Sequence, residues 1–260
     1  METMVKGENL RKRRGKGLRW WHIPIVLLLL LVAAFLVYSF FYYAADETAL
    51  SAMKSDETVS VTETSYGWLF DGPSENTALI FYPGAKVEEM AYAPLLHQLA
   101  EEGMDVCLVR MPLRYAFFNP YAAGDVINTQ DRYTEWYIGG HSLGGVFASW
   151  YAADHPDDFA GVILLASYPI KKLPDKMTEI LLVGSEDKVI SWERLEIGRQ
   201  FASSHYDEHF IEGGNHAQFG SYGSQRGDGI AGISAEEQRR ETVDYIMQHI
   251  DDFIAVVTGN

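Results

Sequence analysis

The 260-residue chain has one cysteine, no cysteine cluster of the zinc-binding type, and no internal repeat or low-complexity tract. A single cysteine, Cys107, cannot form an internal disulfide, so a disulfide-stapled scaffold is excluded. Cys107 lies in the apolar run DVCLV, where we expect a buried structural thiol rather than a reactive one. With 47% hydrophobic and 13% aromatic residues, the chain can instead bury a sizeable core in one or two domains.

Basic residues are scarce beyond the N-terminal segment. Residues 46–260 contain 14 Lys and Arg against 34 Asp and Glu, which gives them a net charge of about −20. The field of such a domain repels polyanions, so we expect no nucleic-acid partner. Solubility is the ordinary reason for this acidity.

The first 45 residues differ from the rest in both charge and hydropathy. Residues 1–19 contain the basic run RKRRGKGLR, whereas residues 20–45 contain no Asp, Glu, Lys or Arg. The apolar stretch 23–41 would form a helix of roughly 28 Å, close to the thickness of the hydrocarbon core of a bilayer. Tryptophans at its start and tyrosines at its end fit the aromatic belts of membrane interfaces. The sequence therefore predicts a transmembrane helix over 20–45.

The positive-inside rule gives this helix an orientation. Residues 1–19 would form a cytoplasmic tail, and residues 46–260 would lie outside the cytoplasm. A cleaved signal peptide is the alternative, since Ala44 and Ala45 are small enough for a cleavage site. The apolar run exceeds the roughly 7–15 residues usual in a signal peptide, which favours an uncleaved signal anchor in the cell membrane.

Residues 46–57 are polar and predict a short linker, followed by a single domain over 58–260. Two alternating runs, 59–65 and 66–73, indicate antiparallel strands. Beyond them, continuous apolar runs alternate with helical stretches, which is typical of a parallel sheet covered by helices on both faces. The expected strands lie at 78–83, 105–112, 136–140, 161–167, 179–184 and 208–213, and the expected helices at 92–103, 143–158, 191–204 and 234–257.

The motif GGHSLGG places Ser142 at the turn between the expected strand 136–140 and the helix that follows it. A strand–turn–helix is the setting of a nucleophile elbow, in which flanking glycines leave room for a strained serine backbone. The helix N-terminus behind the serine supplies a positive dipole end and the N–H of Leu143, and both can stabilise a developing oxyanion. Ser142 is therefore the predicted nucleophile.

A serine nucleophile needs a base, and the base needs an acid that orients it. In doubly wound sheets, catalytic groups gather at the carboxyl ends of the strands. Asp187 lies just past one expected strand in LLVGSEDKVI, and His216 lies just past the next in FIEGGNHAQF. We therefore predict a triad of Ser142, His216 and Asp187, with Glu186 as an alternative for the acid.

The order Ser, Asp, His and the turns GGHSLGG, GSEDKV and GGNH resemble the α/β-hydrolase superfamily over residues 58–257. The wider pattern GGNHAQFGSYGSQRGDG is similar to a membrane-anchored bacterial branch, the α/β-hydrolase fold-5 family. The resemblance implies an α/β fold with a mostly parallel, doubly wound sheet, Asp187 as the acid, and no cofactor. It also implies a second oxyanion donor, the N–H of Ala85 in FYPGAKVEE, although Pro83 stands where the superfamily usually has histidine.

The remaining histidines have less specific expected roles. His205 and His209 could bind a metal together with Asp207, but side chains four residues apart meet closely enough to share an ion only in a helix, and this segment runs into a strand. We therefore expect no metal site. His97, on a predicted helix, and His141, inside the elbow, are expected to be structural.

The sequence thus predicts a single-pass membrane-anchored serine hydrolase that acts on an ester-like bond of a small-molecule substrate, with carboxylic esters first. Gln218 and Phe219, in the glycine-rich loop 217–233, could line its pocket. A catalytically silent scaffold that binds a ligand or partner at the cell surface is the alternative, and thioesterases, lipases and peptidases share the same triad. Only eleven residues, 168–178, stand where the superfamily commonly inserts a lid, so we expect an open site that prefers short acyl groups.

Overall fold

The computed structural model describes residues 20–258, with side chains described through residue 250. The chain divides into two units, Met1–Phe40 and Phe41–Asn260. In the first unit, helix α1 (His22–Phe40) has 19 residues and is long and apolar enough to cross a membrane by length and composition. It falls within the predicted transmembrane segment 20–45. The predicted cytoplasmic tail, residues 1–19, lies outside the described residues.

The second unit is built on an eight-stranded sheet with the order β1-β2-β4-β3-β5-β6-β7-β8. The six strands from β3 to β8 are parallel, and β1 and β2 are antiparallel additions at one side, so the expected fold class is confirmed. The bounds are β1 (Ser60–Glu63), β2 (Gly67–Asp71), β3 (Thr77–Tyr82), β4 (Asp105–Val109), β5 (Glu135–His141), β6 (Gly161–Leu165), β7 (Thr178–Gly184) and β8 (His205–Ile211).

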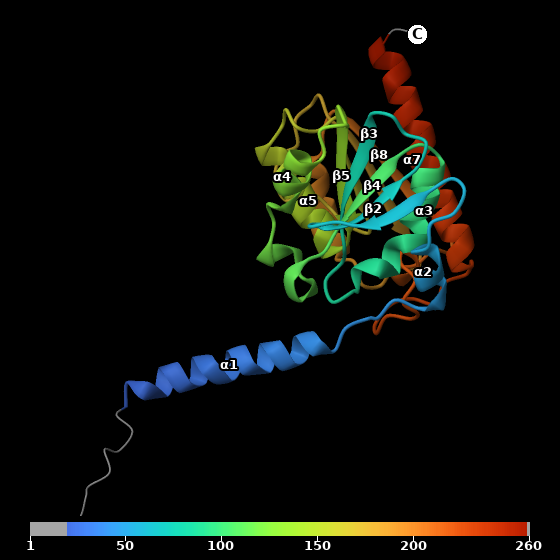
Figure 1. The fold of residues 1–260 in the computed structure, drawn as a ribbon. Coiled ribbons are helices and arrows are strands. Elements are labelled where there is room, and N and C mark those ends of the chain that lie inside the picture. The colour runs from blue at the N-terminus through green and yellow to red at the C-terminus, as the bar shows by residue number, and fades with distance from the viewer. Residues whose placement is uncertain (1–19, 259–260) are drawn as a thin grey trace, which may run out of the picture. The chain divides into compact units, whose positions relative to one another are not determined.

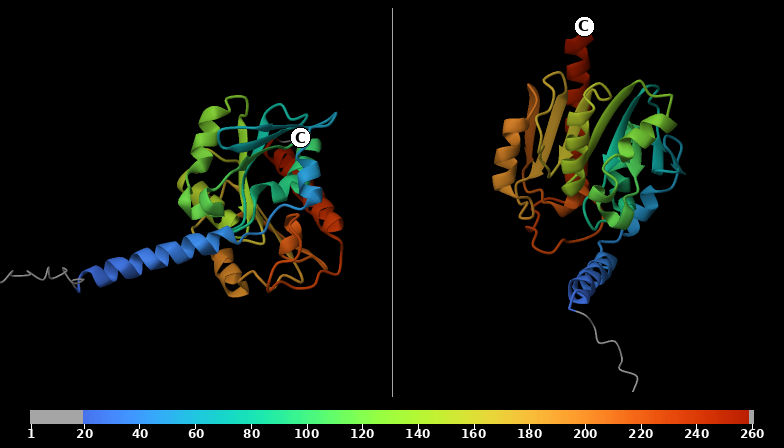
Figure 2. Two further views of the ribbon diagram at one scale, coloured as in Figure 1. Left: turned by 60° about the horizontal axis from the view of Figure 1, so that its bottom comes forward. Right: turned by 90° about the vertical axis from the view of Figure 1, so that its left-hand side faces the viewer.

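Helices cover both faces of this sheet, which explains why the central strands are continuous apolar runs (Figures 1 and 2). Helices α3 (Ala93–Glu101) and α7 (Ala235–Thr258) pack over one apolar core. Helices α4 (Ala122–Thr129), α5 (Leu143–Asp154) and α6 (Trp192–Gly198) pack over the other. Short 3-10 helices complete the fold: η1 (Glu89–Tyr92), η2 (Pro112–Arg114), η3 (Ala116–Phe118), η4 (Arg199–Phe201) and η5 (Ala217–Phe219).

The segment 46–57, expected to be a linker, contains the short helix α2 (Glu47–Ala52). The side chain of Asp46 caps this helix by accepting a hydrogen bond from the Ala49 N–H at 3.0 Å. Ala49 is fully buried, and α2 packs against α3. A helix of six residues has no independent stability in water, so its order comes from this packing.

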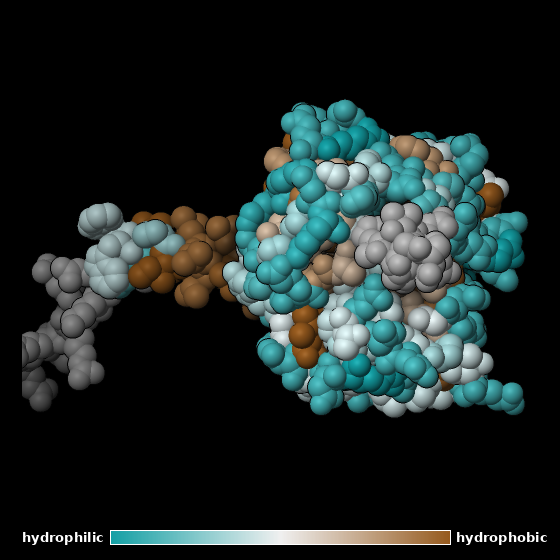
Figure 3. Space-filling view, turned by 90° about the horizontal axis from the view of Figure 1, so that it is seen from above, coloured by the Kyte–Doolittle hydropathy of each residue, from teal (hydrophilic) through white to brown (hydrophobic). Residues whose placement is uncertain are grey.

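The strands β3 to β8 all end at the same edge of the sheet, which we call the carboxyl edge (Figure 1). Figure 3 looks onto the opposite edge of the second unit, and the residues seen there are mainly hydrophilic. Catalytic groups of open α/β sheets collect at the carboxyl edge, and all three predicted triad residues lie in loops or turns that leave it.

Candidate active site

The backbone of Ser142 is held in a strained conformation at the carboxyl edge. Strand β5 ends at His141 and α5 begins at Leu143, so Ser142 forms the turn between them, with φ 53° and ψ −125°. This left-handed region is unfavourable for a residue with a side chain, and such strain is concentrated at functional sites. The Ser142 hydroxyl makes no capping bond to the helix behind it, which leaves it available for chemistry.

The glycines of the motif are required by close backbone approach. A Cβ on Gly140 would lie 2.4 Å from the carbonyl oxygen of Tyr82, and one on Gly144 would lie 2.2 Å from the same atom. A Cβ on Gly145 would lie 2.6 Å from Ser167 Oγ. The pattern G-x-S-x-G therefore reflects the packing of the elbow against β3 and the loop after β6.

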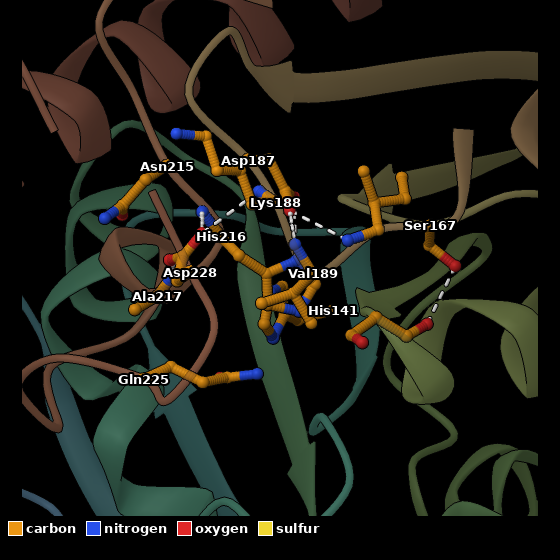
Figure 4. Close-up of polar contacts among 12 residues, drawn as sticks. His141, Ser167, Asp187, Lys188, Val189, Asn215, His216, Ala217, Gln225 and Asp228 are labelled. Atoms are coloured by element: carbon orange, nitrogen blue, oxygen red, sulfur yellow. Dashed lines mark hydrogen bonds and ion pairs between the residues drawn. The ribbon is translucent and has the colours of Figure 1, made fainter. Parts of the chain in front are cut away.

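Asp187 and His216 are joined by a hydrogen bond of 2.7 Å between Oδ2 and Nδ1, and both side chains are buried (Figure 4). The other carboxylate oxygen of Asp187 accepts hydrogen bonds from the N–H groups of Val189 and Ile190, each at 2.8 Å. These bonds fix the carboxylate in the loop after β7. Asp187 therefore holds the imidazole with Nδ1 as its donor atom, and Nε2 is left to act as a base.

The His216 ring lies beside that of His141, the residue before Ser142. The ring centroids of His216 and His141 are 4.4 Å apart, and His141 precedes Ser142 directly in the chain. The hydrogen bonds described for residues 20–258 include none between the Ser142 hydroxyl and the His216 ring. Nucleophile–base hydrogen bonds are often long until a substrate is bound, so this geometry is compatible with a triad.

The two expected oxyanion donors both follow strands at the carboxyl edge. Leu143 is the first residue of α5, and Ala85 follows Gly84 in the loop after β3. Neither backbone N–H has an acceptor on the protein within the described residues 20–258. Two unused N–H groups at the carboxyl edge, one of them at a helix N-terminus, suit a developing negative charge.

A buried hydrogen-bond chain ties the Ala85 loop to the elbow, and the sequence did not reveal it. The Gly84 N–H donates to the hydroxyl oxygen of Tyr92 at 3.0 Å, and that oxygen lies 2.8 Å from His141 Nδ1. Burial raises the pKa of Tyr92 and lowers that of His141 well below its usual value, with the charge of His216 adding to the latter. Both groups are therefore neutral, so Tyr92 donates its only proton to His141 Nδ1.

This chain gives His141 a more specific role than the structural one that the sequence suggested. With Nδ1 accepting from Tyr92, His141 carries its own proton on Nε2. The ring thus presents a neutral face to His216. A Cβ on Gly84 would lie 2.8 Å from both His141 Nδ1 and the Tyr92 hydroxyl, so glycine is needed where this loop passes them.

Of the two residues suggested for substrate binding, Phe219 is buried in the core and Gln218 lines a cavity. Phe219 is fully buried, and its ring packs 5.8 Å from that of His141, behind the site. Gln218 lines a cavity of about 450 Å³ together with Asp228 and other residues of the glycine-rich loop. Its side-chain N–H donates to the Ile233 carbonyl at 3.1 Å. Asp228 fixes the start of the loop by accepting from the Ala217 N–H at 2.9 Å.

Three of the other histidines, His97, His209 and His249, lie against carboxylates. His209 Nε2 lies 2.7 Å from a carboxylate oxygen of Glu241, and Asp207 pairs instead with His249 at 2.8 Å, so His209 and Asp207 have separate partners. His97 and Glu101 of α3 lie near Asp56 of the segment before β1, so that one ligand atom of each lies within 4.8 Å of the others, and His97 Nε2 lies 2.9 Å from Asp56.

The fold and the elbow define a hydrolase-type α/β protein. The chain belongs to the alpha/beta hydrolase family, whose family model matches residues 78–240. This range includes Ser142, Asp187 and His216. No curated protein shows significant sequence similarity to the chain.

Several solved structures share the fold. Est1E from Butyrivibrio proteoclasticus is 15% identical, with a TM-score of 0.53, and the match covers 75% of this chain and 100% of that one. A predicted CIB-like hydrolase from Thermoplasma acidophilum is 17% identical, with a TM-score of 0.53 and coverages of 73% and 99%. A bacterial membrane phospholipase A is 13% identical, with a TM-score of 0.57 and coverages of 90% and 99%. At these identities the likeness concerns the fold.

Proposed function

We propose that this protein is a membrane-anchored serine hydrolase that cleaves carboxylic esters. The observation that carries the proposal is the buried hydrogen bond between Asp187 and His216, beside an elbow that strains the Ser142 backbone. Membership of the alpha/beta hydrolase family supports hydrolysis, and the structurally similar membrane phospholipase A supports an ester substrate.

In the proposed reaction, Ser142 Oγ attacks the carbonyl carbon of the ester while His216 Nε2 accepts its proton. The N–H groups of Leu143 and Ala85 stabilise the negative charge that develops on the carbonyl oxygen. His216 then protonates the leaving alcohol, and an acyl group remains on Ser142. A water molecule, deprotonated by the same histidine, releases the acid. The Asp187 carboxylate stabilises the imidazolium that forms in each half of the reaction.

Helix α1 is proposed to be an uncleaved signal anchor, with the hydrolase unit outside the cytoplasm. Its support is the length and apolar composition of His22–Phe40 and the basic run that precedes it. The phospholipase match covers 90% of this chain, more than the two other matches described.

The test is covalent labelling with a fluorophosphonate, which reacts with an activated serine. The protein should be labelled, and Ser142→Ala should lose the label and lower the rate of ester hydrolysis by about 10⁴-fold or more. Ser149→Ala is the matched control, because Ser149 is a buried serine of the same helix whose hydroxyl bonds only to the Val146 carbonyl. Undiminished labelling of Ser142→Ala would refute the assignment, and an unlabelled wild-type protein would favour the silent scaffold.

A further inference from the structure

The chain enters the second unit at its carboxyl edge. Tyr43 forms a parallel bridge with Val87: its N–H donates to the Lys86 carbonyl at 2.8 Å, and its carbonyl accepts from the Glu88 N–H at 2.9 Å. These partners belong to the loop that carries Ala85. The first residues of the second unit therefore lie beside the proposed oxyanion donor Ala85, at the carboxyl edge of the sheet and not at the opposite edge.

Two more loops of the carboxyl edge hold the same segment. The Asp46 N–H donates to the carbonyl of Ser221 in the glycine-rich loop at 2.9 Å, and the Tyr43 ring packs 5.5 Å from that of Tyr222. From the loop after β4, the Arg114 guanidinium lies 3.4 Å from the centre of the Tyr42 ring. The attachment point is thus fixed by contacts with three loops that surround the site.

Exposed apolar side chains are concentrated at the same edge. In residues 43–250 of the described chain, ten large hydrophobic side chains are exposed, and six of them lie in the four segments that leave β3, β4, β7 and β8, namely 83–92, 110–121, 185–192 and 212–234. These six are Leu113, Phe117, Phe118, Tyr121, Trp192 and Ile230. Ile230 is 91% exposed, and the rings of Phe117 and Phe118 pack against each other and against Tyr115, with Phe117 also near Phe147 of α5.

The segments that carry the exposed apolar side chains are also less acidic than the rest of the domain. The same four segments contain five Lys and Arg against six Asp and Glu, so they are close to neutral in a domain whose net charge is about −20. The acidic residues therefore lie mostly elsewhere, and Figure 3 shows the hydrophilic character of the opposite edge. Apolar and aromatic groups on a near-neutral surface suit a lipid headgroup interface, whereas the acidic remainder does not.

We propose that the carboxyl edge is a lipid-contacting surface and that the hydrolase takes ester lipids from the outer surface of the membrane that holds its anchor. This inference rests on the proposed ester hydrolysis for its substrate, and on the attachment at Tyr43 and the six exposed side chains for the surface itself. The ester group of a membrane lipid lies at the depth that interfacial aromatic residues reach.

The short connection between β6 and β7 fits this arrangement. Residues 166–177, between β6 and β7, contain no helix or strand, so no cap separates the elbow from the membrane surface. The expectation of short acyl groups rests on the lack of an insertion that could form a long apolar tunnel, and a lipid whose acyl chain stays in the bilayer needs no such tunnel. At a bilayer, the ester alone enters the open site while the rest of the acyl chain stays in the lipid.

The first test measures lipid contact without relying on catalysis. Full-length protein carrying Ile230→Cys is labelled with an environment-sensitive fluorophore and reconstituted into phosphatidylcholine vesicles. Glu75→Cys, in the exposed turn before β3 at the opposite edge, is the matched control, and the native Cys107 is fully buried. Nitroxide-labelled phosphatidylcholine should quench the fluorophore at position 230 and not the one at 75. Equal quenching at the two positions would overturn the proposed surface.

The second test separates the lipid substrate from the hydrolase activity. In the same vesicles, the rate on phosphatidylcholine is divided by the rate on p-nitrophenyl acetate in water. The double variant Leu113→Ser, Ile230→Ser should lower this ratio about ten-fold, whereas Ile197→Ser, which changes an exposed apolar residue at the end of α6, should not. Cleavage of the acetate without cleavage of the lipid would refute the inference and leave the proposed function standing. Loss of both activities together with loss of Ser142 labelling would refute the proposed function itself.

Discussion

Replacing Tyr92 by phenylalanine removes the hydroxyl oxygen that links the loop after β3, which carries the proposed oxyanion donor Ala85, to His141, the residue before Ser142. We call this loop, residues 83–88, the oxyanion loop. In the wild-type protein this oxygen accepts from the Gly84 N–H and donates to His141 Nδ1. The ring itself is fully buried and packs 5.1 Å from Phe81, so phenylalanine fills the same space. The substitution therefore tests the hydrogen bonds and not the packing.

The expected losses follow from the two bonds. Tyr92→Phe leaves a buried N–H and a buried imidazole nitrogen without partners, which should lower the free energy of unfolding by about 2–4 kcal/mol. An oxyanion donor is worth about 10²–10³ in kcat. The variant keeps the Ala85 N–H but releases the loop that aims it, so we expect kcat to fall about ten-fold while KM changes little.

Tyr82→Phe is the matched control for this experiment. Tyr82 is also fully buried, and its hydroxyl also makes two hydrogen bonds, donating to the Pro120 carbonyl at 3.2 Å and accepting from the Ala123 N–H at 2.8 Å. These partners belong to α4 and the segment before it, on the other face of the sheet. The control should lose similar stability and keep its kcat.

The assay compares thermal unfolding and steady-state hydrolysis of a p-nitrophenyl ester by the full-length wild type and both variants. Equal kcat values for Tyr92→Phe and Tyr82→Phe would show that Tyr92 only stabilises the fold. A rise in KM at constant kcat would place its effect on substrate binding, and would equally refute a positioning role for Tyr92.

Three further predictions concern stability, the oxyanion loop and topology. Burial raises the pKa of Glu179 to about 7, so the free energy of unfolding decreases as the pH rises from about 4.5 through 7. Glu179→Gln removes the buried carboxylate and should therefore raise the melting temperature at pH 8, by the equivalent of roughly 3 kcal/mol, and not at pH 4. Gly84→Ala, whose Cβ meets two atoms at 2.8 Å, should lower kcat about 100-fold, whereas Gly232→Ala, with its nearest contact at 3.5 Å, should not. An impermeant maleimide should label Glu75→Cys on intact cells but Lys6→Cys only after permeabilisation, and the reverse pattern would contradict the expected orientation.

Features written in short stretches of sequence were predictable. The strands β3 to β7 are continuous apolar runs because both of their faces are covered, and each of the six expected runs overlaps a strand. β8 stands at the side of the sheet and is only partly buried, and its polar first residues explain why the expected run 208–213 begins later than the strand His205–Ile211. The elbow could be recognised because Gly140, Ser142 and Gly144 satisfy a backbone constraint within five residues. Asp187 and His216 follow strands directly, so the geometry of a parallel sheet brings them to one edge.

Features that depend on long-range packing were not predictable. Tyr92 looks like one more apolar residue on a helix face, and nothing in the sequence marks its hydroxyl as the partner of His141, 49 residues away. Helices α2 and α4 are short, with six and eight residues, and their periodicity is too weak to distinguish from a loop. Their order comes from burial of residues such as Ala49 and Val126 against the rest of the unit.

The bridge between Tyr43 and Val87 means that cleavage of the proposed anchor would also remove contacts of the hydrolase unit. A signal peptidase that cut after Ala45 would remove Tyr42 and Tyr43, and with them the backbone pairing of the Ala85 loop and the stacking on Arg114 and Tyr222. The freed chain would begin at Asp46. The Lys86 N–H would still donate to the Arg114 carbonyl and the Ser221 N–H to the Ala91 carbonyl, so the three loops would stay joined but would lose the segment that contacts all of them. Under the proposed function, loss of the anchor would therefore also change the support of the loop that carries Ala85, and the shed form would differ from the tethered one at its active site.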